Sequence, residues 1–166
     1  MKNVLRMLAE NIQPAPGHRS WHGGPTPLGA LRGVTAEQAY WAPAPGRKNI
    51  WALTLHIAYW TYAIRRRLDG EQLPRFPRGP ANWPTVHEIP SERAWRADVE
   101  LLRQERERLL DAVTKVPMTR LGTKPAGAKE WTYGQLILGI AQHDAYHTGQ
   151  IQLLKRLWEG GDRGGR

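Results

Sequence analysis

The apolar side chains of this 166-residue chain recur every three or four positions along three long segments and one short one. That spacing places them on one face of an α-helix, the face that a globular protein turns toward its core. Alternation with period two, the mark of a half-buried strand, is nowhere long enough to be convincing. The sequence therefore predicts an all-α protein in which helices pack on one another.

Prolines, glycines and capping residues set the boundaries of the predicted helices. The first predicted helix ends near residue 12, and the other three cover residues 49–69, 91–116 and 132–158. Brief helical turns begin at residues 26 and 35. Five prolines between residues 72 and 90 fit no helix interior and predict a surface loop. We expect a four-helix bundle with long Pro/Gly-rich connections as one domain over residues 1–160, and a Gly/Arg-rich tail over residues 161–166.

The composition limits the chemistry. The chain has no cysteine, which excludes disulfides, cysteine nucleophiles and Cys-ligated metals. With 24 Lys and Arg against 15 Asp and Glu, the net charge of +9 permits an anionic partner. The arginines are scattered, however, so we interpret the charge as a solvated surface and do not expect nucleic acid. No apolar run approaches the roughly 18 residues of a membrane span and no signal peptide is evident, so we expect a cytoplasmic protein without a membrane partner.

Two histidines, His143 and His147, lie four residues apart in the apolar stripe of the last predicted helix. At that spacing both imidazoles leave one face of the helix and can reach one metal ion. A third, His56, lies in the middle of the inner stripe of the second predicted helix, where an unpartnered imidazole would cost about 1–3 kcal/mol. Three inward histidines on two helices favour a metal site inside the bundle over three separately satisfied core histidines. The remaining histidines lie in predicted loops: His18, His22 and His87.

Several motifs resemble the DinB-like (YfiT-like) superfamily of metalloenzymes. They are residues 21–23 (WHG), 33–38 (GVTAEQ), 50–60 (IWALTLHIAYW) and 142–151 (QHDAYHTGQI), and the resemblance covers nearly the whole chain. It implies a four-helix bundle of up-down-down-up connectivity and a divalent metal ion, usually zinc or nickel, on His56, His143 and His147. It also implies chemistry of the thiol S-transferase or hydrolase type, with a low-molecular-weight thiol as a cosubstrate. Related bundles often pair, but the sequence does not establish a homodimer.

Two charged residues near the predicted site each have two interpretations. Asp144 makes the segment from His143 to His147 similar to the His-Glu-x-x-His pattern of zinc peptidases, in which the acid is the general base. It is either a catalytic acid or base, or a structural partner of an imidazole or a basic residue. Arg106 interrupts the apolar stripe of the third predicted helix and either meets an anionic group of the substrate or extends to solvent.

Polar and aromatic residues on the same faces are candidates for a substrate pocket. Tyr146 and Gln150 flank the two histidines of the last helix. They have three alternative roles: contact with substrate, support of a metal ligand, or packing in the core. Trp60, with Trp51 and Trp21, lines an apolar pocket or forms ordinary core. The sequence thus predicts a metal-dependent transferase or hydrolase that acts on a small molecule. The alternative is a non-catalytic, metal-containing binding protein whose basic surface recruits an anionic or nucleic-acid partner.

Overall fold

The computed structural model describes residues 2–20, 22–70 and 74–161. Within these ranges the chain forms helices and no β-strand. The helices are α1 (Lys2–Ile12), α2 (Pro27–Ala30), α3 (Ala36–Tyr40), α4 (Ile50–Asp69), α5 (Glu92–Lys115), a 3-10 turn η1 (Met118–Arg120) and α6 (Tyr133–Gly161). The all-helical prediction is confirmed, and the predicted tail beyond residue 161 lies outside the described residues.

Capping residues begin the long helices where the sequence places them. The side chains of Asn49 and Ser91 accept hydrogen bonds from the backbone three residues on, at the starts of α4 and α5. Thr132 and Gln135 form a reciprocal capping box at the start of α6. The expected end of α6 near Trp158 is wrong, because the helix continues to Gly161. Glycine lowers helix stability but does not prevent a terminal turn from forming.

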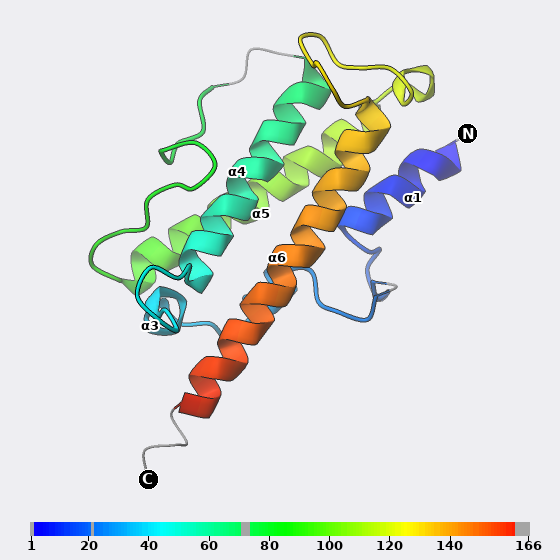
Figure 1. The fold of residues 1–166 in the computed structure, drawn as a ribbon. Coiled ribbons are helices and arrows are strands. Elements are labelled where there is room, and N and C mark those ends of the chain that lie inside the picture. Colours follow the sequence, from blue (N-terminus) through cyan, green and yellow to red (C-terminus); the bar gives the residue numbers. More distant parts are fainter. Residues whose placement is uncertain (1, 21, 71–73, 162–166) are drawn as a thin grey trace.

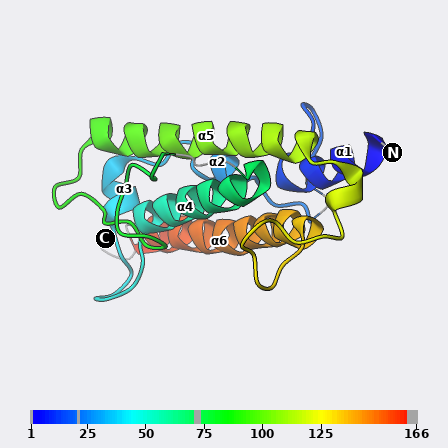
Figure 2. The ribbon, with the colours of Figure 1, turned by 90° about the horizontal axis from the view of Figure 1, so that it is seen from above.

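Helix α4 lies at the centre of the arrangement and contacts both α5 and α6, while α1 contacts α5 and α6 from the other side (Figures 1 and 2). Helix α1 covers only one end of this group. At the opposite end α2 packs on α6 and α3 packs on α4. Figure 1 shows that α4 and α5 run in the same direction and that α1 and α6 run in the opposite one.

The parallel course of α4 and α5 explains the long proline-rich connection between them. The chain leaves α4 at Gly70, which adopts the left-handed conformation that glycine tolerates. It must then return along the whole of α4, about 30 Å, before α5 can begin. The described part of the connection, residues 74–91, runs back along the length of α4 with most of its residues exposed (Figure 1).

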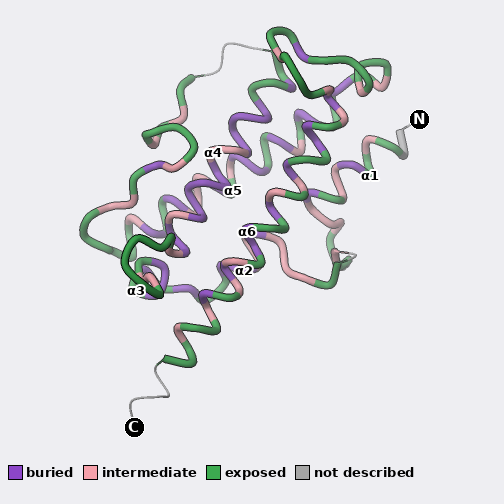
Figure 3. Tube along the Cα trace, viewed as in Figure 1, coloured by how far each residue is buried: buried purple, intermediate pink, exposed green. Residues whose placement is uncertain are grey.

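Buried residues gather on the facing sides of α4, α5 and α6 (Figure 3). One apolar cluster joins the first half of α4 to α3, the start of α5 and the end of α6, and a second joins the end of α4 to α1, the end of α5 and the start of α6. The indole N–H groups in this core are bonded, as expected for buried tryptophans. Trp51 donates to Asp98 at 2.8 Å, and Trp95 donates to the Val34 carbonyl at 2.8 Å.

The interior also contains two ion pairs, which join α5 to α4 and to α6. Arg65 of α4 is buried and donates two hydrogen bonds to Glu105 of α5, at 3.0 and 3.1 Å. Arg106 of α5 is 2% exposed and pairs with Asp144 of α6. The arginine-rich composition is therefore only partly a solvated surface. No helix in the described part of the chain is long and apolar enough to cross a membrane.

Candidate metal centre

Three histidines from α4 and α6 converge where these two helices pack. His56 comes from α4, and His143 and His147 lie one turn apart on α6. One imidazole nitrogen from each ring lies within 4.8 Å of the others. The Nε2 atoms of His56 and His143 are 3.1 Å apart. The sequence singled out the same three residues, and the structure brings them together.

The outer nitrogens of two rings are held by acceptors. His56 donates from Nδ1 to the backbone carbonyl of Asn82 at 2.6 Å. His147 donates from Nδ1 to Oε1 of Gln150 at 2.7 Å. Because each Nδ1 carries the proton, the Nε2 atom of each neutral ring has a free lone pair, and the Nε2 of His56 faces the other histidines. This is the arrangement in which outer partners orient histidine ligands toward a metal.

The environment also lowers the pKa of two of the rings. The pKa of His56 is lowered to about 4, mainly by burial and also by the neighbouring His147, His143 and Lys48, against the opposing effect of the Asn82 carbonyl. Burial lowers the pKa of His147 as well. Metal ligation requires neutral imidazole, which the lowered pKa values of His56 and His147 favour. The three residues therefore fit a divalent metal ion in donor type and geometry.

The third ring, His143, has an unsatisfied nitrogen next to an unsatisfied carboxylate oxygen. His143 Nδ1 and Asp144 Oδ1 are both buried without a hydrogen-bond partner, and they lie 3.8 Å apart. The carboxylate is positioned to orient this ring as Asn82 and Gln150 orient the other two.

Asp144 is fixed by Arg106, and this corrects both interpretations of the arginine. The Arg106 guanidinium pairs with Oδ2 of Asp144 and donates to the carbonyl of Ile12, at the end of α1, at 2.8 Å. With 2% exposure it does not extend to solvent. It is also absent from the residues that line the two cavities beside the histidines. Asp144 is paired with a basic residue, which was one of its two predicted roles.

The long connection between α4 and α5 supplies the nearest neighbours of His56. The Trp83 ring stacks on the His56 ring, with centroids 3.8 Å apart and planes 11° apart. Asn82 adopts a φ of 68°, and its side-chain oxygen accepts a hydrogen bond from Trp60 Nε1 at 2.8 Å. A non-glycine residue at positive φ is strained, and such residues concentrate at functional sites. The sequence interpretation missed Asn82 and Trp83, although an asparagine in a proline-rich loop was an available signal.

The other predicted site residues divide into those near the histidines and those elsewhere. Tyr146 is 66% exposed and its ring lies 4.9 Å from that of His147, so it does not pack in the core. Trp60 lies 6.1 Å from His143 between ring centroids. Trp51 is fully buried core, and Trp21 lies outside the described residues. The three loop histidines stay apart from the trio; of these, His87 packs on Trp51.

Two cavities reach the trio from different sides and share no lining residue. The first, about 600 Å³, lies along α4 and α6 and includes His143 and Trp60. The second, about 520 Å³, includes His147, Tyr146 and Trp83 and is bordered by Arg47 and Lys48. The Lys48 ammonium lies 4.6 Å from the centroid of the Trp83 ring. Cavities of this size accommodate small molecules.

Comparison with known proteins assigns the chain to a family. The sequence matches the DinB superfamily over residues 26–151, about three quarters of its length. The matched region contains all three histidines and the connection that covers them. This chain belongs to the DinB superfamily. No curated protein and no solved structure matches it significantly.

Proposed function

We propose that this protein is a metal-dependent enzyme that acts on small molecules, with a divalent ion held by His56, His143 and His147. The observation that carries the proposal is the candidate ligand group itself, which in the described part of the chain has three members and no fourth. Structural zinc sites use four protein ligands, whereas three ligands with an open position are the catalytic pattern. Zinc and nickel both suit imidazole ligands.

A divalent ion in this position lowers the pKa of a bound water or thiol and thereby provides a nucleophile at neutral pH. The chain's own residues prepare the site for that chemistry. Asn82 and Gln150 fix the orientation of two rings, and Asp144, held by Arg106, lies beside the third. Trp83 covers one face of His56 and excludes water from it.

The two cavities favour transfer between two substrates over hydrolysis of one. Each cavity contains a different histidine of the trio, His143 or His147, so two organic molecules can approach the site together. Hydrolysis would use one cavity and water. In a thiol transfer, sulfur bonds to an electrophilic carbon, and the leaving group departs with the electrons of its former bond. The thiol proton passes to the leaving group or to water.

The wider architecture is part of the same proposal. The directions of α1, α4, α5 and α6 support the up-down-down-up bundle that the family resemblance implies. A homodimer through the C-terminal part of α6, away from the cavity beside His143, is supported by apolar side chains on its outer face, of which Leu153 is 55% exposed and Leu157 is 45% exposed. Sedimentation of the purified protein tests the dimer, and a monomer at all concentrations would contradict it.

Metal content provides the direct test of the site. We expect untagged protein to retain a divalent metal and each of His56→Ala, His143→Ala and His147→Ala to lose most of it. His22→Ala is the matched control, because His22 is exposed and bonds only within its own loop. Full metal content in all three ligand variants would overturn the proposal.

The reaction type is tested separately with the metal-loaded protein. Low-molecular-weight thiols are combined with electrophilic acceptors, and thioether formation is compared with product release in the absence of thiol. Thiol-dependent turnover that is lost in His143→Ala supports transfer. Turnover that proceeds equally without any thiol would show hydrolysis instead.

A further inference from the structure

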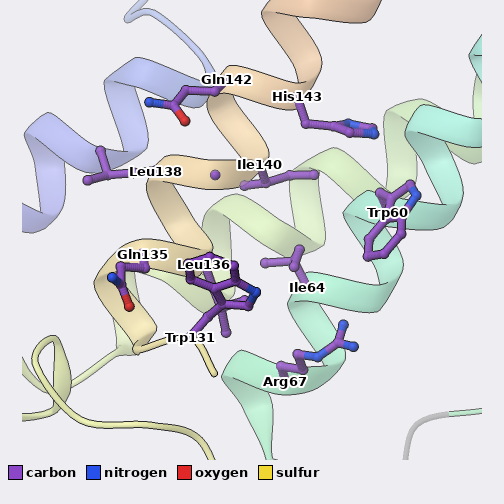
Figure 4. A pocket seen from close by; sticks show the side chains of 11 residues that line it. Trp60, Ile64, Arg67, Trp131, Gln135, Leu136, Leu138, Ile140, Gln142 and His143 are labelled. Carbon is purple, nitrogen blue, oxygen red and sulfur yellow. The ribbon is translucent and has the colours of Figure 1, made fainter. Parts of the chain in front are cut away.

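The groove beside His143 is apolar over most of its length and has a single charge at the far end. Its walls come from α4, α6 and the loop that leads into α6 (Figure 4), and they include Trp60, Ile64, Arg67, Trp131, Leu136 and Ile140. Arg67 is the one cationic side chain among the described residues that line it. A ligand that fits this surface is apolar along its body and charged at one end.

The near end of the groove opens on the candidate metal centre. His143 belongs to both, and its ring lies 6.1 Å from that of Trp60. The Trp60 indole is held in place by its hydrogen bond to Asn82. A molecule in the groove therefore presents one end to the histidine trio.

The far end carries a guanidinium that has no carboxylate partner among the described residues. Arg67 donates to the carbonyl of Ala63 at 3.0 Å, and no ion pair includes it. In Figure 4 its side chain extends from α4 toward the Ile64 and Trp60 side of the groove. Its position contrasts with that of Arg65, two residues earlier, which is buried against Glu105. Arg67 is exposed and thus keeps hydrogen-bond donors available at the edge of an apolar surface.

The spacing of the two ends sets the length of the ligand. Arg67 follows Trp60 by seven residues, which corresponds to about 10 Å along the axis of α4. One guanidinium neutralises one negative charge and pairs well with a carboxylate. A phosphate dianion would call for a second cation, which this groove does not offer in its described lining.

We propose that this groove binds an apolar carboxylic acid, with its carboxylate on Arg67 and its other end at His143. The inference rests on the proposed function, which identifies the end of the ligand at His143 as the end that reacts. It adds to that function the class of substrate. A second copy of the chain, packed through Leu138 and Trp131, is the competing occupant. The experiment below separates the two.

Octanoate binding to the purified protein, measured by calorimetry, tests the proposal, with octanol as the neutral counterpart. We expect Arg67→Gln to weaken octanoate binding about tenfold or more, the value of a charged hydrogen bond, and to leave octanol binding unchanged. Arg66→Gln is the matched control, since Arg66 is exposed in the same turn of α4 but does not line the groove. Trp131→Ala should weaken both ligands.

Equal octanoate affinity in the parent protein and Arg67→Gln would overturn the assignment. So would octanoate binding that appears only after Leu138→Glu has produced monomers, because the groove would then belong to a dimer interface. The measurements are made on metal-loaded and metal-free samples whose metal content is determined in parallel. The metal content tests the proposed metal site. The change in octanoate affinity caused by Arg67→Gln tests the groove separately.

Discussion

Replacement of Asp144 by asparagine removes the charge that faces Arg106 while preserving the size of the side chain. The two side chains are 4% and 2% exposed, so the arginine cannot turn to solvent when its partner is lost. It keeps the hydrogen bond to the Ile12 carbonyl and can donate to the asparagine oxygen, but its charge is no longer neutralised. Removing one member of a buried pair costs about 3–5 kcal/mol, a large share of the stability of a typical domain.

Removal of both charges should cost much less than removal of one. In the double variant Arg106→Met, Asp144→Leu no charge is left buried, and apolar replacements of a buried pair are often close to neutral. The remaining loss is the hydrogen bond to Ile12, about 1 kcal/mol. Urea denaturation of metal-free protein measures both variants. Glu100→Gln, on the exposed side of α5, is the control that should change stability far less.

Two outcomes would refute this reasoning. One is a loss below about 1 kcal/mol for Asp144→Asn, which would mean that the pair is solvated or that Arg106 finds another partner. The other is a double variant as unstable as the sum of the two single changes, which would mean that the charges are not coupled. Recovery of stability, metal content and turnover in the double variant would show that Asp144 neither orients His143 nor acts as a catalytic base.

Three smaller perturbations follow from other contacts. Asn82→Ala forces alanine into positive φ and removes the hydrogen bond to Trp60. Metal affinity should therefore fall about 10- to 100-fold in a chelator competition assay. Asn82→Gly should lose less metal affinity, because glycine tolerates positive φ. The free energy of unfolding of metal-free protein should decrease as pH falls from 6.5 toward 4, because His56 is protonated at higher pH in the unfolded chain than in the folded one. Denaturant unfolding at a series of pH values measures this dependence. His56→Asn should make the free energy of unfolding depend less on pH. Thr132→Ala should cost about 1 kcal/mol in urea denaturation by removing the bond to Gln135, and Thr132→Ser should not.

The helices and the histidine trio were predictable because their signals are local. Caps such as Asn49 and Ser91, and helix-ending residues such as Gly70 and Pro117, are read directly from neighbouring residues. His56, His143 and His147 stood out because they occupy positions that leucine would otherwise fill in apolar stripes. Two such stripes face each other in any helical bundle, so convergence of the three rings required no knowledge of the loops.

The contacts that support the trio depend on how the helices are rotated and connected, and the sequence does not encode that locally. Whether Arg106 reaches Asp144 or solvent is decided by the angle between α5 and α6. The partnership of Asn82 with His56 exists because α4 and α5 are parallel, which brings the connection back over the site. Proline content identified that connection as non-helical but could not show that it packs on α4.

The separation of the ligands along the chain has a mechanical consequence. His56 and His143 are 87 residues apart, and they belong to the first and last long helices of the central group. An ion bound to both rings closes a loop of that length, and in the chain-entropy description a covalent link closing about 100 residues stabilises a protein by about 4.7 kcal/mol. In a chain without cysteine, the ion would serve as a reversible tether in place of a disulfide. Withdrawing it would remove this link between α4 and α6 and leave only their apolar packing, so tolerance to heat and proteases should follow metal occupancy.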